Sequence, residues 1–68
     1  MEPWYTIYTK DNDIVSIDND DFVIYKDTDG KYVAIGRYYG GLGSYSSLKE
    51  AKDTKWNYYK FVTATDIN

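Results

Sequence analysis

Short stretches rich in apolar residues are separated along the chain by polar turn residues. Two of these stretches, residues 22–26 and 31–39, flank residues 27–30, Asp-Thr-Asp-Gly. Aspartate begins tight turns and glycine accepts a positive φ without strain, so this segment is the clearest hairpin in the sequence. Residues 3–9 and 14–17 are rich in aromatic and β-branched residues, which predicts two further strands.

The second arm of the hairpin has two distinct faces. Alternation places Tyr32, Ala34, Gly36 and Tyr38 on one face and the odd-numbered residues between them, together with Tyr39, on the other. Gly36 leaves a gap in the first face, against which we expect a ring or a helix to pack.

The last third of the chain predicts a loop, a helix and a final strand. Residues 40–44, Gly-Gly-Leu-Gly-Ser, have the composition of a flexible connection and match no phosphate-binding loop pattern. Ser47-Leu48-Lys49-Glu50 fits a capping box, which predicts a short helix from Leu48 to Thr54 or Trp56. Residues 58–65 are again β-like. The predicted fold is therefore α+β, a small antiparallel sheet of four to five strands with one short helix packed on it, in the order ββββαβ.

Composition limits the chemistry of this chain. Its 68 residues allow one domain, residues 1–68, and the absence of cysteine and histidine removes disulfides and the usual zinc ligands. A calcium loop beginning at Asp27 is excluded because Lys31 and Tyr38 stand at its fifth and twelfth positions. We expect no metal, no cofactor and no enzymatic activity. With no apolar run of membrane-spanning length and no signal peptide, we expect a cytoplasmic protein.

Charge is divided unevenly along the chain. The first 30 residues carry eight acids and two bases, whereas the remainder carries three acids and six bases. Three Asp-x-Asp pairs recur in the acidic part, at residues 11–13, 18–20 and 27–29. In an extended chain the two carboxylates of a pair lie about 6.6–6.8 Å apart on one face, comparable to the phosphate repeat of a nucleic-acid strand. Aspartate is also a standard turn residue, and the two interpretations are compatible.

Tyrosine is the second unusual feature, with nine residues in the chain. Exposed tyrosines either cover sheet faces or provide contact area for a partner, and the sequence leaves both interpretations open. An acidic surface favours a protein partner with a basic nucleic-acid-binding surface. The candidate partner-binding residues are Asp18, Asp20, Asp21, Asp27, Asp29, Tyr25, Tyr32, Tyr38 and Tyr39.

One segment, residues 29–51, resembles a known pattern. Gly30-Lys31-Tyr32-Val33-Ala34, Leu42-Gly43-Ser44-Tyr45 and the start of the predicted helix are similar to the DNA-binding domains of plant ethylene-response factors and of phage-type integrases. The resemblance implies a three-stranded sheet with a helix, and DNA binding through basic and aromatic residues on the sheet. Lys31 and Arg37 occupy the hairpin here, but the aspartates that crowd it depart from the family pattern.

Size, acidity and tyrosine content also resemble small phage-encoded inhibitors, such as anti-CRISPR proteins and inhibitors of uracil-DNA glycosylase. This looser resemblance implies inhibition of a nucleic-acid-processing host enzyme by an acidic, tyrosine-rich surface that mimics DNA. Two alternatives remain open. One is a DNA-binding module that uses Lys31 and Arg37 together with Lys49, Lys52, Lys55 and Lys60. The other is a structural domain that self-associates through its C-terminal strand.

Overall fold

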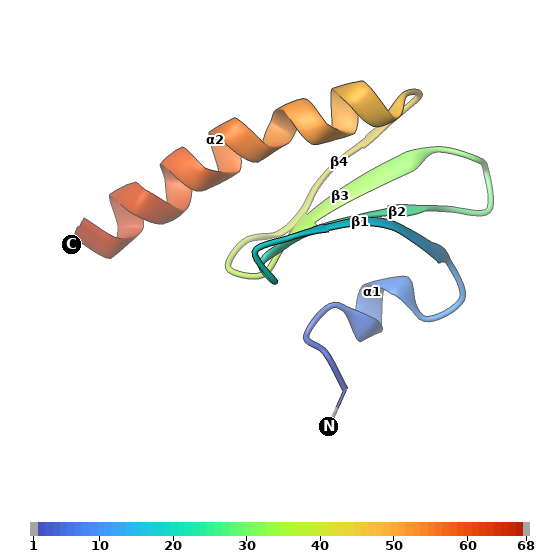
Figure 1. Ribbon diagram of the computed structural model, residues 1–68, viewed down its shortest axis with the longest axis horizontal. Coiled ribbons are helices and arrows are strands. Elements are labelled where there is room, and N and C mark those ends of the chain that lie inside the picture. The colour runs from blue at the N-terminus through green and yellow to red at the C-terminus, as the bar shows by residue number, and fades with distance from the viewer. Residues whose placement is uncertain (1, 68) are drawn as a thin grey trace.

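The computed structural model describes residues 2–67, with side-chain environments for residues 2–64. In chain order the elements are helix α1 (Thr6–Thr9), strands β1 (Asp13–Asp18), β2 (Phe22–Lys26), β3 (Tyr32–Gly36) and β4 (Gly40–Tyr45), and helix α2 (Leu48–Ile67). The strands form one antiparallel sheet in the order β1-β2-β3-β4. Helix α2 lies along one face of the sheet, and α1 lies on the opposite side (Figure 1). The predicted α+β class, with four antiparallel strands and a helix on the sheet, is confirmed.

The predicted hairpin is present as β2 and β3 and forms the centre of the sheet, although its second strand ends at Gly36 and not at Tyr39. Phe22 and Ile24 pair with Gly36 and Ala34, and these side chains pack against α2. Val23 pairs with Ile35 on the other face, and both are buried. Both faces of this hairpin are covered, which explains why its two strands consist almost entirely of apolar residues.

Gly36 receives the ring of Tyr58, which confirms the gap predicted at this position. A Cβ at Gly36 would lie 2.6 Å from Cζ of Tyr58 and 2.8 Å from its Cδ1, closer than van der Waals contact allows. The Tyr58 side chain is buried, and its hydroxyl accepts a hydrogen bond of 3.0 Å from the backbone amide of Tyr38. One tyrosine thus fixes α2 to β3 and to the connection that follows β3.

Helix α2 begins at the predicted residue. The Glu50 amide donates to the Ser47 hydroxyl at 3.2 Å, and that hydroxyl donates to Glu50 Oε1 at 3.0 Å. The predicted end was wrong: the helix continues through residues 58–65, which we expected to be a strand. Leu48, Ala51, Tyr58 and Val62 all pack on the sheet. Their helical spacing overrides the local β preference of the aromatic and β-branched residues.

Residues 40–44 form most of β4 and are not a loop. Gly36 pairs with Gly40 and Tyr32 pairs with Tyr45, while Leu42 is an extra residue that makes a β-bulge. Glycine weakens a strand but does not prevent backbone pairing, and a bulge is a common place for it. The flanking aromatic and apolar side chains, Leu42 and Tyr45, pack under α2 and hold the strand in place.

The N-terminal segment, residues 3–9, was also predicted wrongly as a strand. Its backbone bonds locally, since the amide of Thr9 donates to the carbonyl of Tyr5 at 3.1 Å. The Trp4 ring makes edge contacts with Tyr5 and Tyr8, and its Nε1 donates to the carbonyl of Asp20 at 2.6 Å. Aromatic residues favour any half-buried surface, and here they pack against one another instead of lining a strand.

Candidate functional site

The predicted partner-binding residues lie at two opposite ends of the sheet. In a sheet whose neighbouring strands are consecutive, successive turns alternate between its ends, as Figure 1 shows. The β1–β2 turn and the β3–β4 connection meet at one end and bring together Asp18, Asp20, Asp21, Tyr38 and Tyr39. The β2–β3 turn holds Asp27 and Asp29 at the other end, with Tyr25 and Tyr32 on the adjoining strands. The length of β2 places about 13–14 Å between the two groups, so each group lies at its own end of the sheet.

The first group, together with Arg37, forms what we call the acidic-aromatic end. Asn19 and Asp20 have positive φ values of 53° and 57°, as both central residues of a type I′ turn require. The Asp21 amide closes this turn by donating to the Asp18 carbonyl at 3.2 Å. The Arg37 amide in turn donates to the Asp21 carbonyl at 2.9 Å, which joins the β1–β2 turn to the β3–β4 connection.

Tyr59, on α2, forms hydrogen bonds with the β1–β2 turn. Its hydroxyl lies 2.7 Å from Oδ2 of Asp18 and 3.1 Å from Oδ1 of Asp21, so its single proton is donated between two carboxylates. Burial, and then the hydrogen bond to Asp18, hold the pKa of Tyr59 well above its usual value. The predictions missed Tyr59 because it fell in a segment that was expected to be a strand.

Charge at this end is compensated only in part. The guanidinium of Arg37 lies 3.7 Å from Oδ2 of Asp20, and the ammonium of Lys55 lies 3.9 Å from Oδ2 of Asp18. The Asp20 side chain is 71% exposed, and exposed pairs of this kind contribute about 0–1 kcal/mol. Asp20 is therefore accessible to a cation on another molecule. Tyr38 and Tyr39, on the β3–β4 connection at this end, are 61% and 60% exposed, and the guanidinium of Arg37 lies 5.6 Å from the ring centre of Tyr38.

The opposite end is a well-formed turn. Oδ1 of Asp27 accepts hydrogen bonds of 2.9 Å from the amides of Asp29 and Lys31, which confirms the turn role of Asp27. Burial, and then the charge of Asp27, raise the pKa of Tyr25. Tyr32 packs against the core below α2, with the ammonium of Lys26 5.6 Å from its ring centre. Asp29 is exposed on the turn.

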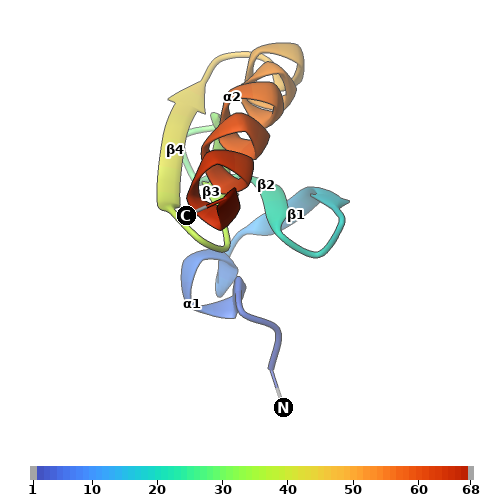
Figure 2. The ribbon, with the colours of Figure 1, turned by 90° about the vertical axis from the view of Figure 1, so that its left-hand side faces the viewer.

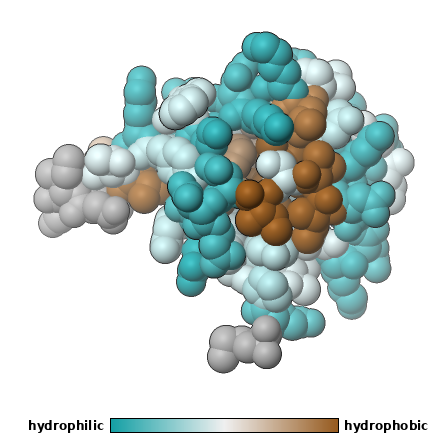
Figure 3. Space-filling model, viewed as in Figure 1, coloured by the Kyte–Doolittle hydropathy of each residue, from teal (hydrophilic) through white to brown (hydrophobic). Residues whose placement is uncertain are grey.

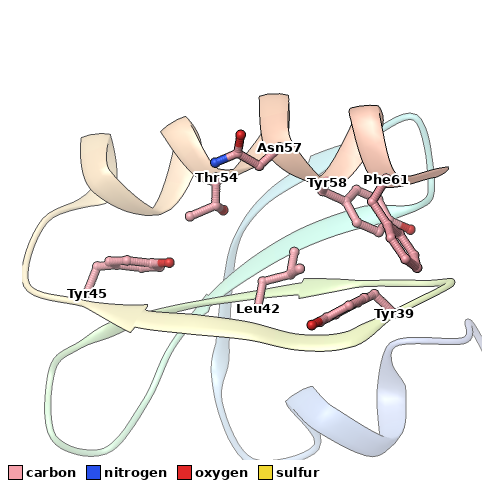
Figure 4. Close-up of a pocket in the computed structure, with 7 residues that line it drawn as sticks. All are labelled: Tyr39, Leu42, Tyr45, Thr54, Asn57, Tyr58 and Phe61. Atoms are coloured by element: carbon pink, nitrogen blue, oxygen red, sulfur yellow. The ribbon is translucent and has the colours of Figure 1, made fainter. Parts of the chain in front are cut away.

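An aromatic groove of about 350 Å³ lies between β4 and α2. In Figure 4 Tyr45 stands at one end of it, Tyr39 and Phe61 stand at the other, and Leu42 rises from β4 between them. The rings of Tyr39 and Phe61 meet edge to face at 5.0 Å. The lining residues are Tyr39, Leu42, Tyr45, Thr54, Asn57, Tyr58 and Phe61, none of them charged. Of these, sequence reasoning had identified only Tyr39 as a candidate.

The basic residues of the DNA-binding alternative are dispersed. Lys31 lies at the β2–β3 turn and Arg37 at the acidic-aromatic end, while the remaining lysines of that hypothesis, Lys49, Lys52, Lys55 and Lys60, lie on α2. The face of the sheet opposite α2 carries Val23 and Ile35, and on the edge strand β1 the partly exposed Ile14 and Ile17. Figure 3 shows apolar side chains gathered over the strands.

Self-association through a C-terminal strand is contradicted, because residues 58–65 belong to α2. The sheet within residues 2–67 ends instead at β1 on one side and at β4 on the other.

We expect Tyr59→Phe to lower the free energy of unfolding by about 1.5–3 kcal/mol, the range for a hydrogen bond to a charged group. The raised pKa of Tyr59 in the folded protein means that folding favours the protonated phenol. The stability that Tyr59 contributes is therefore fully present below the pKa of the unfolded chain, about 10, and is lost as the pH rises above that value. Urea unfolding should show that the wild type loses stability between neutral and alkaline pH, and that Tyr59→Phe loses less over the same change in pH. Equal pH dependence in both proteins would contradict a stabilising role for the hydrogen bonds from Tyr59 to Asp18 and Asp21.

The described part of the chain contains neither a metal-binding group of side chains nor a membrane-spanning helix. No group of three or more acidic, histidine or cysteine side chains within it is arranged to hold a metal ion. Neither described helix has the length and apolar character needed to cross a membrane.

Comparisons with protein-family models, with curated proteins and with solved structures gave no match for this chain.

Proposed function

We propose that this protein is a non-catalytic inhibitor that binds a basic, nucleic-acid-binding surface of another protein through its acidic-aromatic end. The observation that supports this most strongly is that the β1–β2 turn and the β3–β4 connection lie together at that end. The guanidinium of Arg37 lies 3.7 Å from exposed Asp20 and 5.6 Å from the ring centre of exposed Tyr38. The backbone hydrogen bond of 2.9 Å from the Arg37 amide to the Asp21 carbonyl joins the two turns.

Rigidity makes this end suitable for recognition. Tyr59 holds the Asp18 and Asp21 carboxylates, and Tyr58 holds the amide of Tyr38. A surface already ordered in the unbound protein loses little conformational entropy when a partner binds. Carboxylates also steer a basic partner toward the site, and tyrosines add apolar contact area.

The competing functions have weaker support. DNA binding would have to overcome repulsion between phosphates and the carboxylates of the acidic-aromatic end. Four lysines, Lys49, Lys52, Lys55 and Lys60, lie on α2, apart from Lys31 and Arg37. Catalysis would require nucleophile and base side chains within hydrogen-bonding reach in a cleft. The groove between β4 and α2 offers hydroxyls, one amide and rings, with no ionisable acid or base other than tyrosine.

A pair of charge-matched variants tests the proposal. Asp20→Asn with Asp21→Asn removes two charges at the acidic-aromatic end and keeps the turn, because asparagine tolerates positive φ. Asp11→Asn with Asp29→Asn removes the same charge outside that end. Tagged protein should capture a nucleic-acid enzyme from host lysate, and duplex DNA should compete with that capture.

We expect the first variant to bind the captured enzyme at least about tenfold more weakly, equivalent to about 1.4 kcal/mol, and to relieve inhibition of that enzyme. The second should behave like the wild type. Equal losses in both would indicate an effect of net charge alone. Full binding by the first variant would overturn the assignment of this surface.

A further inference from the structure

The two edges of the sheet differ in how they are protected. Edge strands expose unpaired backbone groups to which another chain can add, and charged side chains commonly prevent this. Strand β1 carries Asp13 and Asp18 and has a bulge at Val15. Strand β4, Gly-Gly-Leu-Gly-Ser-Tyr, also has a bulge but contains no charged residue. In Figure 2 β4 forms the flank of the molecule, with no described element beyond it.

The aromatic groove lies directly beside this unprotected edge. A strand added to β4 would point alternate side chains toward α2 about 6.8 Å apart. The groove extends from Tyr45 past Leu42 to Tyr39 and Phe61, so two or more such side chains would meet rings along it (Figure 4). Its volume of about 350 Å³ is at the lower end of ligand sites, which suits side chains better than a whole cofactor.

A second copy of this chain fills the groove poorly. The β4 strand of another molecule would bring Leu42 and Tyr45 as its only large side chains, and both already pack against their own α2. Three of the other residues of β4 are glycines, which have no side chain to insert. The groove therefore favours a foreign strand with large apolar side chains over self-pairing.

Charges along the outer rim of the groove specify the partner further. Asn57 lines the groove, Asp53 and Glu50 precede it on α2 by about one and two turns, and Lys60 follows it by about one turn. The side chain of Asp53 is 61% exposed and has only an exposed ion pair with Lys49. A basic side chain on the added strand would meet this acidic half of the rim.

We infer that β4 and the aromatic groove bind an extended segment of a partner protein by strand addition. That segment has apolar side chains at alternate positions and a basic residue near Asp53. This surface is separate from the acidic turn of the proposed function, although Tyr39 borders both.

The test uses a display library of short random peptides selected on the full-length protein. Thr54→Trp fills the groove from α2, because the Thr54 side chain points toward β4 (Figure 4). Thr63→Trp makes the same change at an exposed position of α2 outside the groove. Gly41→Lys places a charge on the edge, where a Cβ meets nothing within 4 Å. Circular dichroism verifies that each variant is folded.

Selected peptides should share alternating apolar positions and should slow hydrogen exchange in residues 40–45 of the protein. Thr54→Trp and Gly41→Lys should each weaken their binding at least about tenfold, equivalent to about 1.4 kcal/mol, whereas Thr63→Trp should not. Peptides without alternation, binding that Thr54→Trp leaves intact, or a dimer that Gly41→Lys dissociates would overturn the inference. The Asp20→Asn and Asp21→Asn variant should retain peptide binding, which separates this result from the proposed function.

Discussion

Replacing Tyr58 by alanine should lower the free energy of unfolding by about 3–5 kcal/mol, the cost of removing a large buried ring. Tyr58 is 2% exposed, lies 6.0 Å from the ring centre of Phe22 and fills the gap at Gly36. A chain of 68 residues has a total stability of about 3–10 kcal/mol, so the variant should be largely unfolded or close to it.

Urea unfolding followed by circular dichroism measures this effect, and Tyr58→Phe is the matched control. Phenylalanine keeps the ring and loses only the hydroxyl that accepts from the Tyr38 amide, which should cost about 0.5–1.5 kcal/mol. If alanine and phenylalanine cost the same, the ring does not fill the space that the structure assigns to it.

Gly36→Ala should destabilise the protein by about 1–3 kcal/mol, the usual cost of overpacking a core. The added Cβ would enter the space of the Tyr58 ring, which is buried between the sheet and α2 and has little room to move. The measurement is the urea midpoint at constant slope.

Gly41→Ala is the matched control on the neighbouring strand. Its Cβ would meet nothing within 4 Å, and alanine restricts the unfolded chain, so we expect no loss or a gain of up to about 1 kcal/mol. Similar losses at Gly36 and Gly41 would mean that backbone freedom, and not contact with Tyr58, explains the effect at Gly36.

Local chemistry was sufficient to predict some elements and insufficient for others. The β2–β3 hairpin and the start of α2 depend on neighbouring residues, such as Asp27 in its turn and Ser47 in its cap. The extent of α2 and the existence of β4 depend on contacts distant in sequence. Residues 48, 51, 55, 58 and 62 have a helical spacing that was visible in the sequence. The β-like composition around Tyr58 concealed it.

The candidate site was predicted in composition but not in arrangement. The Asp-x-Asp pairs at residues 18–20 and 27–29 were predicted correctly to lie at turns, whereas Tyr38 and Tyr39 were expected in a strand that in the structure ends at Gly36. The strand order that separates Asp20 from Asp29 follows only from the complete sheet. Both interpretations of exposed tyrosine apply in this chain. Tyr58 and Tyr59 use their hydroxyls to fix structure, whereas Tyr38 and Tyr39 stay exposed.

Binding of a basic protein partner at the acidic-aromatic end can be tested by hydrogen exchange of the captured complex, compared with the protein alone. We expect slower exchange in residues 18–21 and 37–39, with residues 27–31 at the opposite end unchanged. Slower exchange confined to residues 27–31, or to residues 14–17 of β1, would show that the partner binds elsewhere.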